Sequence, residues 1–325
     1  MNMASDTFST CNSTDVLAAR NNCDTACTKT CNNNDSAEEM PTEQDCSNHV
    51  SDVSEVTHTL RELTCEEKQA LEQDKKLVTD FKQRKYEAEA QKNWDLFYKR
   101  NTTKFFKDRH WTKREFAELV QNQDSGKMVV FEVGCGVGNF MFPLLEEEQN
   151  TYFYACDFSK RAVEFVKENP LYDSERCSVF HCDITETDLS NHVPDSCVDV
   201  ATMIFVLSAI HPDKMVLALQ NVYKVLKSGG CLLFRDYGQY DYAMLRFTPG
   251  HKLSDNFYVR QDGTRAFYFS IEKLKEMAEA AGFISASCDY IYRQTVNKKQ
   301  GLAVPRIFVQ AKFVKPKTVD NAAAT

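Results

Sequence analysis

The sequence of 325 residues lacks several features that would assign it to a familiar class of protein. Its longest strongly apolar stretch, residues 200–210, is about half the length of a membrane-spanning helix, so we expect no membrane segment. The N-terminus has neither the basic and apolar regions of a secretory signal nor an arginine-rich presequence. The 13 cysteines form no C-x-x-C pair, unlike those of small disulfide-stapled secreted proteins. We therefore predict a soluble cytoplasmic protein, with nuclear access left open.

Several catalytic motifs are also missing. The chain contains no phosphate-loop lysine motif, no H-E-x-x-H zinc motif and no G-x-S-x-G nucleophile motif. Cys23, Cys27 and Cys31 recur every four residues, but this spacing fits no common metal-site template, and we predict no metal. The common phosphate-loop, zinc-protease and serine-hydrolase classes are therefore not indicated.

The net charge of -8 is distributed unevenly along the chain. Residues 1–65 hold 3 basic and 11 acidic residues, whereas residues 82–114 hold 11 basic and 4 acidic residues. Residues 293–317 hold 7 basic residues and no acidic ones. Basic segments with interleaved aromatic residues suit a nucleic-acid backbone with stacked bases, although solvated helix faces can show the same composition.

Composition and periodicity divide the chain into four parts. Residues 1–63 are rich in Asn, Ser, Thr and Asp and predict a disordered acidic tail. Residues 64–125 predict a basic helical extension, in which one long helix runs from a capping box at Thr64 toward Arg100. Residues 126–317 alternate strands and helices, and residues 318–325 form a second tail. Within the third part, residues 237–269 are too long for a plain connection and predict a substrate-binding insert.

The alternation from residue 128 onward predicts an α/β fold. Apolar strands are expected at 128–133, 152–156, 177–182, 198–207 and 231–234, with helices between them. Such an order favours a mostly parallel, Rossmann-like sheet with helices on both faces.

Residues at the ends of these strands predict a ligand-binding site. Gly134, Gly136 and Gly138 lie directly after the first strand in the order G-x-G-x-G, which differs from the dinucleotide fingerprint G-x-G-x-x-G. Asp157 ends the second strand, where a carboxylate can accept both ribose hydroxyls, and Asp183 follows the third. Either acid can instead cap a helix, since Ser or Thr follows each. A nucleoside pocket without a phosphate loop makes S-adenosylmethionine the leading ligand.

At these residues the chain resembles the class I methyltransferases, and among them the tRNA 3-methylcytidine methyltransferases. The resemblance is carried by EAQKNWDLFYKRN (89–101), FFKDRHWT (105–112), EVGCGVGN (132–139), YACDFS (154–159), IFVLSAIHPDKM (204–215), FRDYGQYDYAMLRF (234–247), NFYVRQDGTR (256–265) and VNKK (296–299). It implies a seven-stranded sheet and an enzyme that methylates N3 of cytidine 32 in the tRNA anticodon loop. The most similar branch acts on serine tRNAs with seryl-tRNA synthetase as helper, and neither DNA nor a membrane is expected as a partner.

The resemblance also implies site residues. The cofactor contacts would be made by the glycine loop, by acids and apolar residues at strand ends, and by an aromatic lid: Gly134, Gly136, Asp157, Asp183, Ile184, Ile204, Trp94 and Tyr98.

Chemistry at the target base suggests one catalytic residue. The N3 lone pair of cytosine needs no general base. Methylation leaves the ring cationic, so a hydrogen-bond acceptor near the 4-amino group would stabilise the developing charge. Asp236, just after a strand, is our candidate, although an ion pair with Arg235 or Arg246 would equally explain it. The candidate base and phosphate contacts are Arg109, His110, Arg114, Arg235, Tyr237, Arg246, Arg260, Lys298, Lys299 and Arg306.

Other readings of the same residues remain open. The cofactor domain serves many substrates, so a methyltransferase acting on a small molecule or a protein is the first alternative. A non-catalytic RNA-binding subunit with this fold is the second, and a nicotinamide-linked enzyme is the third.

Overall fold

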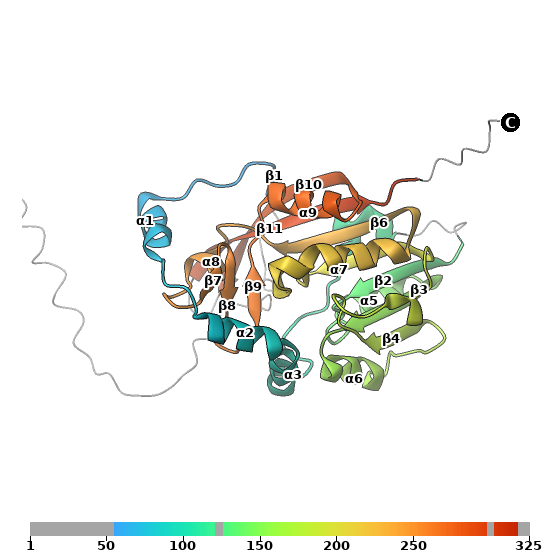
Figure 1. Ribbon diagram of the computed structural model, residues 1–325. Coiled ribbons are helices and arrows are strands. Elements are labelled where there is room, and N and C mark those ends of the chain that lie inside the picture. The colour runs from blue at the N-terminus through green and yellow to red at the C-terminus, as the bar shows by residue number, and fades with distance from the viewer. Residues whose placement is uncertain (1–54, 121–125, 298–301, 318–325) are drawn as a thin grey trace, which may run out of the picture. The chain divides into compact units, whose positions relative to one another are not determined.

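Figure 1 shows the computed structural model of the chain, which describes residues 55–120, 126–297 and 302–317. The predicted tails up to residue 54 and from residue 318, together with Lys298 and Lys299, lie outside the described residues. No helix among the described residues is both long and apolar enough to cross a membrane.

The predicted α/β sheet is present, with one strand more than expected. In the described residues it has eight strands in the order β1-β10-β11-β6-β5-β2-β3-β4. Five neighbours are parallel: β6 (Leu226–Tyr237), β5 (Val198–Ile204), β2 (Met128–Val133), β3 (Thr151–Asp157) and β4 (Cys177–His181). The remaining three are antiparallel: β11 (Leu302–Val314), β10 (Ile284–Asn297) and β1 (Glu55–Thr57).

Strand β1 corrects the expectation of disorder up to residue 63. Residues 55–57 pair with residues 290–292 of β10 and extend the sheet from seven strands to eight. An edge strand presents unpaired backbone groups, so a short polar segment can join it without an apolar pattern of its own. Composition alone therefore placed the end of the tail too late.

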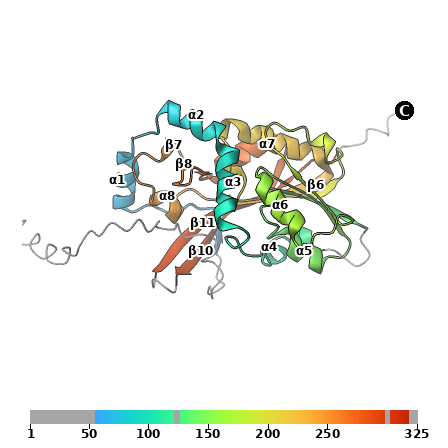
Figure 2. The same ribbon diagram turned by 90° about the horizontal axis from the view of Figure 1, so that it is seen from below.

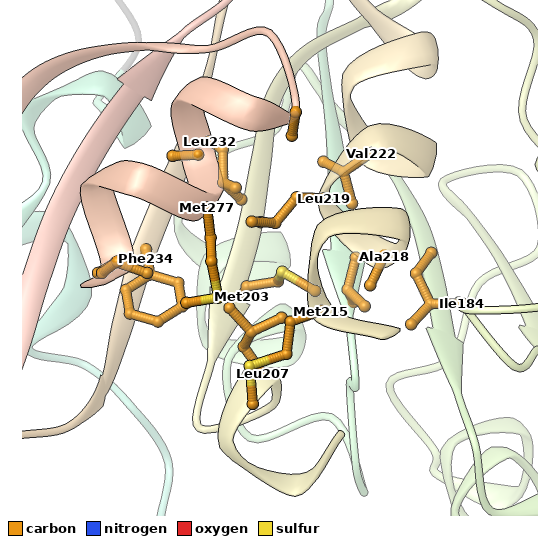
Figure 3. Packing of buried hydrophobic residues seen from close by; sticks show 14 of the residues in the cluster. Ile184, Met203, Leu207, Met215, Ala218, Leu219, Val222, Leu232, Phe234 and Met277 are labelled. Carbon is orange, nitrogen blue, oxygen red and sulfur yellow. The ribbon is translucent and has the colours of Figure 1, made fainter. Parts of the chain in front are cut away.

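Helices cover both faces of the sheet, as predicted. On one face, α7 (Pro212–Val225) and α9 (Ile271–Ala280) pack on β6, where Leu219 and Met277 meet Leu232 and Phe234 (Figure 3). On the other face, α5 (Met141–Glu147) and α6 (Lys160–Glu168) bury an apolar stripe against β2 and β3. Because β2, β3 and β5 lie between these layers, their sequences read as nearly continuous apolar runs.

The single long helix expected from Thr64 toward Arg100 is wrong. The capping box at Thr64 is present, but the segment forms α1 (Cys65–Gln73), α2 (Asp80–Ala88) and α3 (Ala90–Asn101), followed by the short α4 (Thr112–Glu115) (Figures 1 and 2). The first break falls where Val78 is buried and its N–H donates to Lys252 O at 2.8 Å. Tertiary packing therefore overrides the helical pattern of residues 74–79.

The insert predicted at 237–269 contains secondary structure of its own. It holds α8 (Tyr242–Leu245) and a separate three-stranded antiparallel sheet of β7 (Lys252–Ser254), β8 (Phe257–Val259) and β9 (Arg265–Phe267). Tyr258 and Tyr268 form a small apolar cluster there with Met244. The insert is therefore a packed unit beside the sheet.

Candidate active site

A cavity of about 480 Å³ opens at the carboxyl ends of the parallel strands. This is the edge at which open α/β sheets bind ligands, and the volume lies in the usual range for small-molecule sites. All eight residues predicted to contact the cofactor line it: Trp94, Tyr98, Gly134, Gly136, Asp157, Asp183, Ile184 and Ile204.

The glycine loop between β2 and α5 brings backbone to the cavity wall. Gly134 and Gly136 have φ values of 68° and 55°, in the left-handed region that glycine tolerates best. A Cβ atom at Gly136 would lie 2.9 Å from the hydroxyl of Tyr98, and one at Gly134 would overlap Val206. Both positions therefore need glycine for conformation and for space.

Asp157 is held rigidly at the end of β3. Its two carboxylate oxygens accept hydrogen bonds of 2.8 Å from the backbone N–H groups of Gly136 and Ser159. Ser159, rather than Asp157, caps α6 by accepting from Ala162 N–H, so the helix-capping alternative does not account for the aspartate. Burial raises the pKa of Asp157 to about 6, although the two backbone hydrogen bonds oppose this shift.

Asp183 and Ile184 follow β4 on the same rim. Oδ1 of Asp183 accepts from the backbone N–H and the hydroxyl of Thr185 at 2.9 and 2.7 Å. The carbonyl oxygen of Ile184 accepts from the buried side chain of Asn221, which fixes the apolar Ile184 side chain on the cavity wall. An acid beside an apolar side chain suits the amino group and the face of an adenine ring.

Glu132, the last residue but one of β2, is a site residue that we did not predict. It lines the cavity, is 4% exposed, and its Oε2 has no hydrogen-bond partner within the described part of the chain. Burial raises the pKa of Glu132 to about 8, partly offset by the charge of Arg109. A cationic ligand would stabilise the ionised form, so this buried acid fits a ligand that carries positive charge, as S-adenosylmethionine does. Its position directly before the glycine loop was the available signal.

The predicted aromatic lid lies over the cavity. Trp94 and Tyr98 lie one turn apart on α3, with ring centroids 6.2 Å apart, and both line the cavity. Phe97 on the same helix packs edge-to-face on Phe105, with ring centroids 4.7 Å apart, which anchors the lid in an aromatic cluster. The aromatic stripe thus packs on neighbouring residues and also shapes the site.

Comparison with known proteins identifies the family. Residues 131–232 match a family described as a methyltransferase domain. The chain is 60% identical over 258 residues to the human tRNA N(3)-cytidine methyltransferase METTL6, covering 79% of this chain and 91% of the relative. It is 43% identical to the Schizosaccharomyces pombe tRNA N(3)-methylcytidine methyltransferase trm141, covering 73% and 97%.

The chain belongs to the tRNA N(3)-cytidine methyltransferase family. A solved SAM-dependent methyltransferase from Anabaena variabilis shares the fold, with a TM-score of 0.51, 16% identity, and coverage of 74% of this chain and 97% of that structure. The predicted fold class, the enzyme class and the cofactor S-adenosylmethionine are confirmed. The cofactor supplies an activated methyl group, and the residues that would hold it are those lining the cavity.

Six of the ten predicted substrate residues fall into three groups. Arg109 lies on the cavity wall, with its guanidinium carbon 5.7 Å from the centroid of the Phe205 ring. His110, Arg114 and Arg246 are exposed, and the first two lie 3.7 and 3.9 Å from the carboxylates of Glu147 and Glu115. Tyr237 and Arg260 contact each other in the insert. Phosphate contacts of the exposed group stay a prediction.

Two predicted substrate contacts, Arg235 and Arg306, are buried in the structure, and their contact with tRNA stays a prediction. Each is only 2% exposed. Arg235 forms an ion pair with Glu115, and the Nε of Arg306 donates to Asp241 Oδ2 at 2.9 Å. Their charges are satisfied inside the protein because acids from distant segments face them, and charge counted along the sequence cannot show this.

Asp236 is fully buried, and the residues that line the cavity do not include it. Its oxygens accept hydrogen bonds of 2.9 Å from the backbone N–H groups of Ser208 and Tyr237. The alternative ion pairs with Arg235 and Arg246 are not among its contacts either, since Arg235 pairs with Glu115 and Arg246 is exposed beside Tyr242. A catalytic contact of Asp236 with the base stays a prediction, and its observed contacts hold the backbone beside the site.

Phe205 is a second residue that sequence reasoning missed. It follows β5, lines the cavity and has a φ of 59°, which is uncommon for a bulky side chain. Its N–H donates to Arg235 O at 2.7 Å, and its ring lies 5.1 Å from that of Tyr237 and 5.4 Å from that of Phe308. The strained backbone therefore presents an aromatic ring at the rim of the cofactor cavity.

Proposed function

We propose that this chain methylates N3 of cytidine 32 in the anticodon loop of tRNA, that serine tRNAs are its substrates, and that seryl-tRNA synthetase assists it. The observation that carries the reaction is the identity of 60% to a relative named tRNA N(3)-cytidine methyltransferase, over 91% of that relative. The choice of serine tRNAs and of the helper rests on the sequence resemblance described above.

The site suits an extruded base. N3 lies on the Watson–Crick edge of cytosine, so the base must be unpaired or flipped to react. Phe205 offers an aromatic surface at the cavity rim, and Tyr237 and Arg109 flank it. A cytosine stacked there would bring N3 toward the methyl group without requiring a general base, so orientation would supply much of the rate.

The electrostatics favour methyl transfer to a neutral base. Glu132, Asp157 and Asp183 line the cavity, and the ring becomes cationic once N3 is alkylated. Because the positive charge passes from the sulfonium group of the cofactor to the base, the buried acids Glu132 and Asp157 would face a cation before and after the transfer. The exposed side chains of His110, Arg114 and Arg246 lie outside this acidic centre, where they are accessible to phosphates.

The experiment incubates the purified chain with labelled S-adenosylmethionine and total tRNA, with and without seryl-tRNA synthetase, and digests the RNA to nucleosides. We expect a 3-methylcytidine peak in the serine tRNA fraction that Asp157→Ala abolishes. A peak only in other tRNAs would refute the serine assignment, and a peak unaffected by the synthetase would refute its role as helper. Cofactor binding without methylation of any tRNA would refute the substrate class and favour a small-molecule or protein substrate.

A further inference from the structure

The lid helix α3 is tied to the cofactor side of the site by polar contacts. Gln91 donates from its side-chain amide to Phe158 O at 3.1 Å. Asp95 accepts from the Ser159 hydroxyl at 2.5 Å and from Arg161 N–H at 3.3 Å. These contacts join α3, which carries the predicted lid, to the segment that follows Asp157.

The same helix is tied to the substrate insert through Asn93. This side chain is 8% exposed and donates from Nδ2 to Gly263 O at 3.1 Å. Gly263 has a φ of 83°, and a Cβ atom there would lie 2.7 Å from Asn93 Nδ2. Helix and turn thus fit closely at a point where the insert has no side chain. Figure 2 shows α3 between the insert on one side and α6 on the other.

The turn that Asn93 contacts is connected, through Arg260 and Tyr237, to Phe205 on the cavity wall. Arg260, at the start of this turn, donates from its guanidinium to Arg265 O at 2.7 Å and to the Thr264 hydroxyl at 3.3 Å. Its guanidinium carbon lies 5.6 Å from the centroid of the Tyr237 ring, which packs on Phe205 at the cavity rim. A chain of contacts therefore runs from the lid helix through the insert to the aromatic surface.

A second contact between the extension and the insert is made by α2, the helix that precedes α3. Glu87, near the end of α2, forms ion pairs with Arg265, directly after the turn, and with Lys214 of α7. Glu87 and Arg265 also line the cavity. The extension is thus joined to the insert through Asn93 and Glu87, in addition to the hydrogen bond of Val78 to Lys252, and it is joined to the cofactor segment at α3.

We propose that α3 couples cofactor binding to tRNA binding, and that Asn93 is the positioning residue that transmits this coupling to the insert. When a ligand fixes Trp94 and Tyr98, α3 is fixed, and through Asn93 it fixes the Gly263 turn and the surface of Tyr237. By linkage, each ligand then raises the affinity for the other by the same factor. The inference rests on tRNA as the substrate class and not on which tRNA is methylated.

The test measures both ligands in both states. The affinity of unfractionated tRNA is measured with and without saturating S-adenosylhomocysteine, and the affinity of S-adenosylhomocysteine with and without tRNA, in the presence of seryl-tRNA synthetase. For the wild type we expect each ligand to tighten the other by about fivefold or more, as typical coupling energies imply. Asn93→Ala should reduce this factor to about one while leaving the affinity for S-adenosylhomocysteine alone within about threefold, and kcat should fall more than the KM for S-adenosylmethionine changes.

A matched control lies on the same helix. Asn101 donates from Nδ2 to Phe97 O at 3.0 Å, which is the same kind of bond made inside α3, so Asn101→Ala should keep the coupling factor of the wild type. Asn93→Asp, which has the same shape but cannot donate, should behave as Asn93→Ala does. Independent binding in the wild type, or coupling kept by both Asn93 variants, would overturn the proposal. The proposal would also be overturned if the Asn93 variants bound S-adenosylhomocysteine so much more weakly that this loss of affinity explained their whole loss of activity. Failure of the substrate assignment differs from these results, because it removes methylation from the wild type.

Discussion

The buried carboxyl group of Glu132 predicts that cofactor affinity depends on pH. Its pKa is about 8 in the protein without ligand, so about one molecule in eleven carries the carboxylate at pH 7. If the positive charge of S-adenosylmethionine keeps this group ionised in the complex, binding at pH 7 must first remove a proton, at a cost of about 1.4 kcal/mol. Affinity should therefore rise about tenfold between pH 7 and pH 9.

The assay is calorimetric titration of S-adenosylmethionine at pH 7, 8 and 9 at constant ionic strength. The amino group of the ligand also titrates in this range and weakens binding as the pH rises, so the informative quantity is the difference between variants. Glu132→Gln cannot ionise and should lack the tenfold rise, whereas Glu146→Gln, on the exposed side of α5, should keep it.

A wild-type affinity that changes with pH no more than that of Glu132→Gln would refute the reasoning. It would mean either that Glu132 is already ionised at pH 7, or that it stays protonated when the cofactor binds. Titration of the Glu132 carboxyl group by NMR in the protein without ligand would separate these two cases. A pKa near 8 would mean that Glu132 stays protonated when the cofactor binds, and a pKa well below 7 would mean that it is already ionised.

Three further predictions concern the glycine loop, a buried ion pair and the basic residues at 298 and 299. Gly136→Ala forces a side chain into the left-handed region and against the hydroxyl of the lid tyrosine, so S-adenosylmethionine should bind about tenfold more weakly by calorimetry. Glu115→Gln removes the partner of a buried arginine and should lower the free energy of unfolding by about 3 kcal/mol in urea, whereas Glu118→Gln, whose lysine partner is one-third exposed, should cost less than about 1 kcal/mol. The double variant Lys298→Ala/Lys299→Ala should weaken tRNA binding and reduce the slope of log affinity against log salt by up to about 2, and an unchanged slope would contradict the assignment.

The parallel core was predictable because its signals are local. The predicted bounds of β2 (Met128–Val133) match the structure, and α6 (Lys160–Glu168) is one of the helices expected between the strands. An apolar run ending in glycines marks the first, and a serine cap followed by an amphipathic repeat marks the second. The glycine loop, Asp157 and Asp183 follow from the same signals, since parallel strands place their carboxyl ends on one edge. The resemblance to the family, and not these signals, implied Ile204, Trp94 and Tyr98.

The parts that were mispredicted depend on contacts between distant segments. The break between α1 and α2 arises because Val78 is buried beside Lys252, which lies 174 residues further along the chain. The ion pair of Arg235 with Glu115, which lies 120 residues away, is a second contact of this kind. No window of sequence contains both members of such a pair, so propensity and charge counts along the chain do not reveal the contact.

The two ligands make opposite electrostatic demands on one site. S-adenosylmethionine is cationic and favours the acids Glu132, Asp157 and Asp183, whereas tRNA is a polyanion that these acids would repel. The structure meets both demands by burying the acids: Glu132 and Asp157 are 4% and 7% exposed, in a cavity that Trp94 and Tyr98 of α3 also line. Since repulsion between charges weakens with distance and with screening, burying the acids keeps them close to the cofactor and away from the phosphates. A lid of aromatic side chains on a helix with basic exposed residues is therefore the arrangement that lets one cavity serve both ligands.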